Sequence, residues 1–229
     1  MNDNISKKNK NDHAVSLVKA VLSTAPFTGG IASLISDYLP NSVEKRKAEL
    51  LIKLSKDLEN LENRYNEDTL KKDYFISTFI AASKGVIENH DQEKVNAFRA
   101  IILNTLIAEN PKEDEVAMFI GMTQRLTPLH IKLLKILRDP KLEIEKDPEK
   151  KSKMDAVYSG GISTLTSLII PQYSEDLVKI AFQDLYNMGL HSTSSWGGTM
   201  SAHGITQKRT SEFGDKYIDF ITLPENIVE

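Results

Sequence analysis

The chain has 229 residues, of which 27 % are charged and 40 % belong to the hydrophobic set, and its net charge is −3 at pH 7. These values are ordinary for a folded protein of one large domain or two smaller ones. The charge gives no general attraction to nucleic acid. The chain has no cysteine, which excludes disulfides and zinc sites built on cysteine. Since this composition suits a reducing compartment, we expect a cytoplasmic location.

The first 40 residues change abruptly in polarity. Residues 1–13 are rich in Asn, Asp and Lys, and we expect a flexible polar tail there. Residues 14–39 are almost free of charge, and Pro26 interrupts them near the middle. Proline cannot donate a backbone hydrogen bond, so a turn belongs at that point. The pattern predicts an apolar helical hairpin over residues 14–40.

This predicted hairpin admits two interpretations. Each arm is shorter than the roughly 20 residues that cross a bilayer, so residues 14–39 would contact a membrane by shallow insertion at its surface. Alternatively, the hairpin packs on the rest of the chain or on a second copy. We favour packing, because Ala20, Ala32 and Ser36 give the arms small side chains that suit close helix contact.

Residues 41–65 predict a long amphipathic helix with charged side chains around most of its surface. Its apolar stripe recurs every three or four residues, as one face of a helix requires, and consists of Leu50, Leu54, Leu58 and Leu61. The stripe is too short for a coiled-coil assignment. We therefore take these four leucines as candidate residues for binding a protein partner or a second copy of the chain.

The middle of the chain shows dense apolar residues at helical spacing. Helices are predicted over residues 73–88, 91–109, 113–126 and 128–138. We place a helical core over residues 41–125 and a second domain over residues 126–229. Residues 139–153 are strongly charged and are interpreted as a linker.

The second domain ends in a recognisable series of elements. Ser174 can cap a helix over residues 175–188, and Gly189 stands where a glycine often ends a helix. The segment after it is rich in Ser, Gly and Thr and predicts the tip of a β-hairpin. A short strand over residues 205–208 and a closing helix over residues 210–221 follow.

Three segments of this domain resemble winged-helix domains, namely residues 126–137, 177–190 and 205–214. The resemblance implies the fold of residues 126–222. The expected fold class is therefore mainly α, with a helical bundle followed by a C-terminal winged-helix-like domain that carries a small β-hairpin.

A winged helix often binds DNA, and Lys179, Lys208 and Arg209 are the candidate phosphate contacts here. Residues 158–222 nevertheless contain four Lys and Arg against six Asp and Glu. Because phosphate contact dominates affinity for nucleic acid, this balance disfavours DNA binding and favours a domain that contacts proteins.

Chemical sites are not indicated. No phosphate-binding glycine loop and no nucleophile elbow occurs in the sequence. His191 and His203 would face each other across the predicted hairpin, as two ligands of a metal site would, but no third ligand can be identified. We expect no catalytic residue, no cofactor and no metal. Trp196, the single tryptophan, is either a contact anchor on an exposed loop or a side chain that folds back onto the domain.

Three further segments, residues 97–106, 126–134 and 213–221, resemble in order and spacing the abortive-infection alpha family of bacterial phage-defence proteins. The resemblance covers residues 74–222. It implies a role in halting phage growth and brings no catalytic residues.

The leading hypothesis is a non-enzymatic interaction protein, a phage-defence effector or adaptor that acts through protein–protein contacts or self-association. One alternative is a transcriptional regulator that binds DNA with the winged helix. Another is an effector that perturbs membranes with the N-terminal hairpin.

Overall fold

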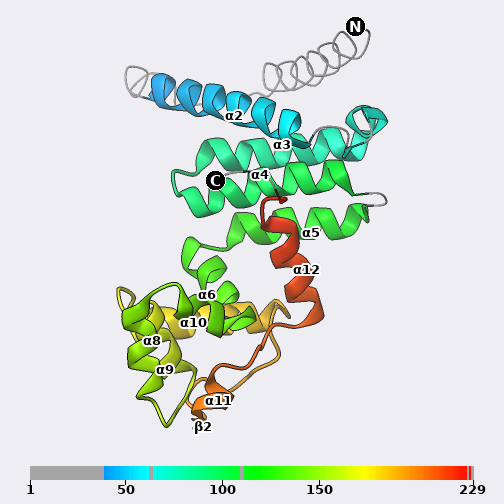
Figure 1. The fold of residues 1–229 in the computed structure, drawn as a ribbon. Coiled ribbons are helices and arrows are strands. Elements are labelled where there is room, and N and C mark those ends of the chain that lie inside the picture. The colour runs from blue at the N-terminus through cyan, green and yellow to red at the C-terminus, as the bar shows by residue number, and fades with distance from the viewer. Residues whose placement is uncertain (1–38, 62–63, 66, 109–110, 226, 228–229) are drawn as a thin grey trace, which may run out of the picture. The chain divides into compact units, whose positions relative to one another are not determined.

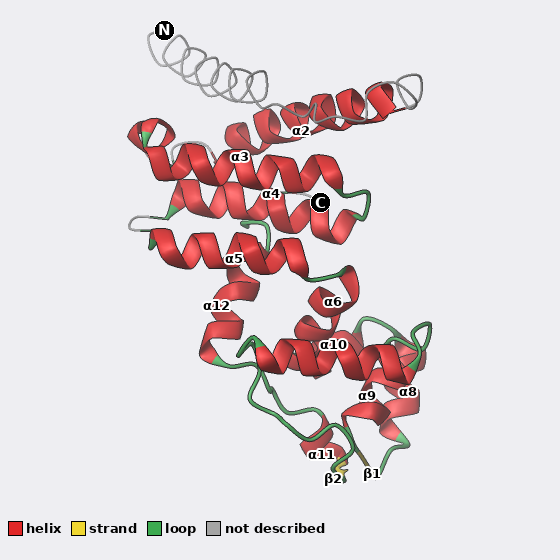
Figure 2. Cartoon of the chain, turned by 180° about the vertical axis from the view of Figure 1, so that it is seen from behind, coloured by secondary structure: helices red, strands yellow, loops and turns green. Residues whose placement is uncertain are grey.

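The computed structural model describes the chain apart from residues 1–38, 62–63, 66, 109–110, 226 and 228–229 (Figure 1). The described residues form eleven α-helices, one 3-10 helix and one two-stranded antiparallel sheet (Figure 2). The prediction of a mainly α-helical protein is therefore confirmed. The predicted tail and nearly all of the predicted apolar hairpin lie outside the described residues. No helix in the described part of the chain is long and apolar enough to cross a membrane.

The chain divides into two compact units, and the division falls at Arg125 and again inside the last helix. Unit 1 comprises Met1–Arg125 and Phe220–Glu229, and unit 2 comprises Leu126–Asp219. The helices of unit 1 are α2 (Leu39–Leu61), η1 (Glu67–Lys71), α3 (Asp73–Glu88), α4 (Gln92–Ile107) and α5 (Glu113–Arg125). The elements that begin in unit 2 are α6 (Pro128–Arg138), α7 (Pro140–Glu145), α8 (Pro148–Asp155), β1 (Ser159–Gly160), α9 (Ile162–Ile169), α10 (Glu175–Asn187), β2 (Met200–Ser201), α11 (Ala202–Ile205) and α12 (Glu212–Ile221).

Unit 1 is a stack of helices in which α3 and α4 lie side by side, with α2 on one side of them and α5 on the other (Figures 1 and 2). The close approach of α3 to α4 requires a glycine, because a Cβ at Gly85 would lie 2.5 Å from the ring of Phe98. Pro40 lies in the first turn of α2, where its missing N–H costs nothing. The helix begins at Leu39, two residues before the predicted start at residue 41.

A buried ion pair connects α2 to α4. Nε and Nη2 of Arg99 donate to the two carboxylate oxygens of Asp57 over 2.5 and 2.7 Å. The two side chains are only 3 % and 2 % exposed. A two-point contact of this kind fixes both the spacing and the rotation of the two helices.

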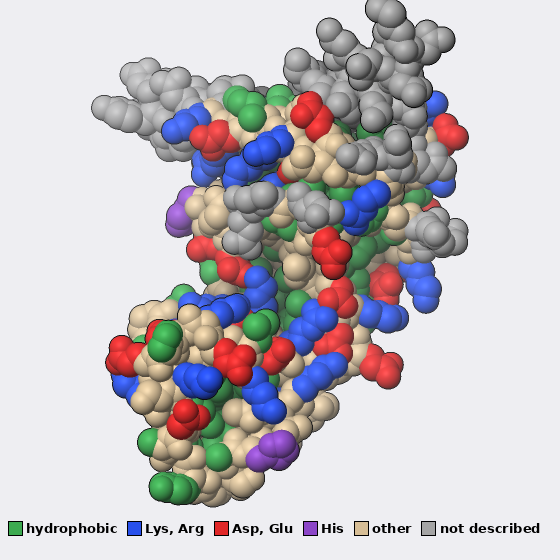
Figure 3. All heavy atoms as spheres, viewed as in Figure 1, with side chains coloured by type: hydrophobic (Ala, Val, Ile, Leu, Met, Phe, Trp, Pro, Cys, Tyr) green, Lys and Arg blue, Asp and Glu red, His purple; other side chains and the backbone are tan. Residues whose placement is uncertain are grey.

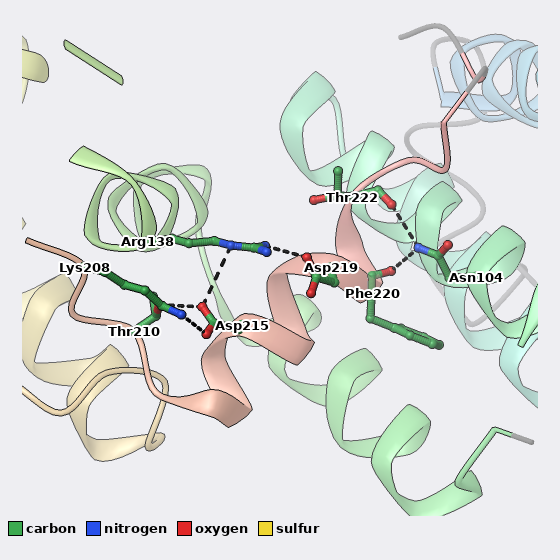
Figure 4. Close-up of polar contacts among 8 residues, drawn as sticks. All are labelled: Asn104, Arg138, Lys208, Thr210, Asp215, Asp219, Phe220 and Thr222. Carbon is green, nitrogen blue, oxygen red and sulfur yellow. Dashed lines mark hydrogen bonds and ion pairs between the residues drawn. The ribbon is translucent and has the colours of Figure 1, made fainter. Parts of the chain in front are cut away.

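The end of the chain returns to unit 1. Nδ2 of Asn104 donates to the carbonyl oxygens of Phe220 and Thr222 over 2.8 and 2.9 Å, at the end of α12 (Figure 4). The ring of Phe220 lies 5.3 Å from that of Phe119 on α5. Residues from Phe220 onward therefore belong to unit 1, so the predicted second domain over residues 126–229 is wrong at its C-terminal end.

Unit 2 is built on α6, whose buried residues are Leu129, Ile131, Leu133, Leu134, Ile136 and Leu137. The charged segment 139–153 is not an extended linker, because it forms α7 and α8. Asp139 and Asp147 cap these helices through hydrogen bonds from backbone N–H groups, and a proline follows each of them at the first helical position. Aspartate followed by proline is a strong helix start, and the charge of the segment concealed it.

The small sheet differs from the predicted hairpin. β1 pairs with β2, so Ser159 lies opposite Ser201 and Gly160 opposite Met200. The predicted strand over residues 205–208 is wrong, since Ile205 ends α11 and a turn follows it. An isolated antiparallel bridge joins His191 to Thr210. The strand signal failed because the residues of this segment bond to α11 and α12 instead of to a neighbouring strand.

Both ends of α12 are held by polar contacts within their own units. In unit 2, Nη1 of Arg138 lies 2.6 Å from Oδ1 of Asp219, and Asp215 accepts from Lys208 and Thr210 (Figure 4). Burial raises the pKa of Asp215, but the hydrogen bonds from Lys208 and Thr210 outweigh it, so this pKa lies below its ordinary value.

We predict that Arg99→Met lowers the free energy of unfolding by about 3–5 kcal/mol, because it leaves the buried Asp57 carboxylate without its partner. Urea denaturation measures the loss. The double variant Arg99→Met with Asp57→Leu should recover part of it, since no buried charge then remains. The control is Lys45→Met, which removes an exposed ion pair with Glu49 on the same helix and should cost less than about 1 kcal/mol. Equal losses at Arg99 and Lys45 would contradict the assignment.

Candidate interaction surface on α10

Helix α10 is held rigidly at both ends. Oγ of Ser174 accepts from the N–H of Leu177 over 3.4 Å at its start. At its end Gly189 has a φ of 72°, and its N–H donates to the carbonyl of Tyr186 over 2.8 Å. The N–H of Leu190 donates to the carbonyl of Leu185 over 3.0 Å. The last two bonds are those of a Schellman ending. The predicted N-cap at Ser174 and the predicted glycine ending at Gly189 are both confirmed.

The inner face of α10 belongs to the core of unit 2. It consists of Val178, Ala181, Phe182 and Leu185, all of which are buried. At the same face Nε2 of His191 lies 2.8 Å from the carbonyl oxygen of Phe182, and the two rings lie 4.3 Å apart. Burial lowers the pKa of His191, although hydrogen bonds to the backbone act in the opposite direction.

Three large apolar side chains of α10 are left partly uncovered by unit 2: Ile180 on the side opposite the buried residues, and Leu177 and Tyr186 on the two flanks. Leu177 is 48 % exposed, Ile180 59 % and Tyr186 38 %. None of these three residues is among the site residues predicted from the sequence, where the contact candidates are the four leucines of α2 and Trp196. A signal was present, since Leu177 and Ile180 fall outside the stripe formed by Val178, Phe182 and Leu185.

Trp196 packs along the side of this helix. Its Nε1–H donates to Oε1 of Glu175 over 3.1 Å, and its ring meets that of Phe182 edge-on at 5.2 Å. The side chain is half-buried. Of the two interpretations that the sequence left open, the ring therefore takes the one that folds back onto the domain. Its role in partner binding stays a prediction.

The three candidate phosphate contacts do not form one basic surface. Arg209 is 7 % exposed, and its guanidinium donates to the carbonyls of Gly204, Ile205 and Gln207. Burial lowers the pKa of Arg209. Lys208 bonds to Asp215 of α12, and only Lys179 lies on the outer side of α10. On the face shown in Figure 3, basic and acidic side chains are interspersed.

The four leucines of α2 are buried within the chain. Leu50, Leu54, Leu58 and Leu61 are at most 6 % exposed, and α2 packs on α3. Their helical spacing is explained by this packing. Their predicted role in binding a partner would require α2 to separate from α3.

The histidine pair considered as a metal site is held apart by its surroundings. His191 is buried against α10, whereas His203 is exposed and lies 2.9 Å from Nε2 of Gln207 on the turn after α11. No group of three or more His, Cys, Asp or Glu side chains that could hold a metal ion occurs among the described residues.

Comparisons of the chain with protein-family models, with curated proteins and with solved structures found no match. The resemblance of three segments to the abortive-infection alpha family therefore stays a prediction.

We predict that His191→Gln reduces the loss of stability on acidification. Burial holds the pKa of His191 below 6.5 in the folded chain, so the unfolded chain binds the proton first as the pH falls. The stability that the neutral ring contributes is therefore complete above the histidine pKa of the unfolded chain. It is lost as the pH falls toward the lower pKa of the folded chain. Thermal unfolding at about pH 7.5 and about pH 5.5 should show a smaller fall in Tm for the variant than for the wild type.

The control for the removal of a histidine as such is His203→Gln, which changes an exposed side chain. An unchanged fall in Tm in His191→Gln would show that this ring does not contribute to the acid sensitivity.

Proposed function

We propose that this chain is a non-enzymatic interaction protein that binds a protein partner through the outer face of α10. We call this the α10 surface and define it by Ile180, opposite the buried residues, with Leu177 and Tyr186 on its two flanks. The observation that carries the proposal is the exposure of these three side chains on a helix whose ends and inner face are firmly held. Exposed apolar side chains on a rigid element are typical of protein contact sites.

The charges around the α10 surface favour one kind of partner. Glu175, Asp176 and Asp184 lie on this helix, whose single basic residue is Lys179, and Asp184 also lies 3.4 Å from Nε2 of His130 on α6. Interfaces combine an apolar centre with a polar rim of complementary charge. The expected partner is therefore a protein whose apolar patch is bordered by Lys or Arg.

The same observations weigh against DNA as the partner. Affinity for DNA depends on cations that are free to meet phosphates. The guanidinium of Arg209 instead donates hydrogen bonds to carbonyl groups inside unit 2, and Lys208 pairs with Asp215. The α10 surface thus presents leucine and isoleucine where a DNA reader presents arginine, lysine or asparagine.

The order of elements in unit 2 supports a winged-helix-like domain as part of this proposal. β1, α9, α10 and β2 follow one another along the chain, and the two strands pair. In that arrangement α10 occupies the place of the recognition helix, so the surface used for DNA in some such domains would bind a protein here.

Site-specific photocrosslinking tests the nature of the partner. A photoreactive residue at position 180 in the full-length protein, in cells that naturally make it, should give a discrete adduct that resists nuclease and is destroyed by protease. The control position is Leu142 on α7, whose exposure of 53 % is close to that of Ile180, and it should give no such adduct. A nuclease-sensitive adduct, or identical adducts from both positions, would contradict the proposal.

We further propose that this binding serves phage defence, as the resemblance of residues 97–106, 126–134 and 213–221 implies. Cells that express the wild type should restrict phage plating. Ile180→Glu should abolish the restriction, because it places a buried charge at the contact, whereas Leu142→Glu should retain it. Equal plating with the wild type and with an empty vector would remove the defence role while leaving the binding proposal intact.

A further inference from the structure

A second helix face that no described residue covers lies in unit 1. The inner side of α5 is buried and consists of Val116, Phe119, Ile120 and Thr123. The opposite side carries Asp114, Met118, Gly121 and Arg125. We call these four residues the α5 stripe. Met118, in the middle, is 52 % exposed.

The spacing of the α5 stripe is that of a helix–helix seam. Its members follow at intervals of four, three and four residues, which places them in one line along the helix. The line lies opposite the buried residues, so it points away from the core of unit 1. A helix that packed along it would meet Met118 and Gly121 at the centre and a charge at each end.

Gly121 has no explanation within the described chain. A Cβ added there would meet nothing within 4 Å among the described residues. Glycine inside a helix is less favourable than alanine. The surface beside Gly121 is therefore open to a side chain from outside, and Met, which is flexible and unbranched, fits irregular gaps well.

The charges of the α5 stripe are complementary to themselves. Asp114 lies in the first turn of α5 and Arg125 in the last. In an antiparallel pair of α5 helices centred between Phe119 and Ile120, Asp114 faces Arg125 of the other copy at both ends. The same register places Met118 of each copy over Gly121 of the other. Reciprocal contacts of this kind define a two-fold interface.

From this arrangement we infer that the α5 stripe is a self-association surface whose occupant is a second copy of this chain, bound antiparallel. Within one chain Asp114 and Arg125 cannot pair, because eleven residues of helix separate them by about 16 Å. Across the two-fold axis they form charge-assisted pairs, and the two helix dipoles lie antiparallel, which is favourable. The inference uses unit 1 alone and does not depend on the α10 surface.

A contact along one helix of 13 residues is short. Its length is about 20 Å, and stable dimers usually bury about 800 Å² on each partner. We therefore expect a weak dimer that forms with increasing protein concentration. Added salt should weaken it further, because the end pairs lie at the rim of the contact.

Charge reversal provides the decisive test, measured by sedimentation equilibrium on the full-length chain. Asp114→Arg alone and Arg125→Asp alone each create like-charge contacts in the dimer and should weaken it by about tenfold or more. The double variant Asp114→Arg with Arg125→Asp restores opposite charges. An equimolar mixture of the two single variants restores them as well. Both should regain an affinity close to that of the wild type.

A second variant tests the central contact without threatening the fold. Gly121→Gln improves the helix propensity of α5, so it should raise thermal stability, while its side chain fills the space that Met118 of the other copy needs. We expect a more stable monomer and a weaker dimer. The control is Gln124→Ala, on the same helix but outside the stripe, which should leave the dimer unchanged.

Three results would overturn the inference. The first is a wild-type chain that stays monomeric at every concentration tested. The second is a dimer that neither charge reversal weakens, because it would then form elsewhere on the chain. The third is a dimer that Gly121→Gln leaves intact. None of these results bears on the photocrosslinking at position 180, so the two proposals fail separately.

Discussion

A guanidinium group keeps its charge when it is buried, so the surrounding chain must supply acceptors for it, and each unit contains such a group. In unit 1, Arg99 takes both oxygens of Asp57 and joins α4 to α2. In unit 2, the guanidinium of Arg209 donates to the carbonyls of Gly204 and Ile205 at the end of α11. The backbone N–H of Arg209 donates to the carbonyl of Leu137 at the end of α6 over 2.8 Å. Breaking either set of contacts would leave a charge in a poorly hydrated place, which costs far more than the contacts gain. These two arginines therefore constrain which helices must lie together, and neither is available as a surface cation.

Much of the helical architecture follows from local pattern. The apolar period of residues 73–88 corresponds to α3 (Asp73–Glu88), and Ser174 and Gly189 mark the two ends of α10 as predicted. Helix period and caps depend on residues close in sequence, so they can be seen without a structure. The mainly α-helical character of the chain was predictable for the same reason.

The wrong predictions concern residues whose contacts are made with parts of the chain far away in sequence. From the sequence, Arg209 is a candidate phosphate contact of a DNA-binding winged helix, yet it is buried by the turn that follows α11. The strand expected at residues 205–208 had the right composition, but β1, some 40 residues earlier in the chain, provides the actual partner of β2. In the same way, the stripe of Leu50 and Leu54 has the pattern of a binding face, and only the packing of α2 on α3 shows that it is filled within the chain. An amphipathic pattern states that a face needs covering and leaves open what covers it.

The α5 stripe and the α10 surface would act together, because dimerisation through the first doubles the number of binding sites of the second in one assembly. A dimer formed along α5 would carry two α10 surfaces, so a partner with two matching sites would bind the second site at a high effective concentration once the first is occupied. Each contact could then be weak, as a single exposed helix face suggests, while the assembled complex holds firmly. Because a weak dimer forms only as the protein accumulates, binding through the α10 surface would strengthen with the amount of protein in the cell. Such a dependence requires no catalytic group, and it needs only two modest apolar faces on separate units of one chain.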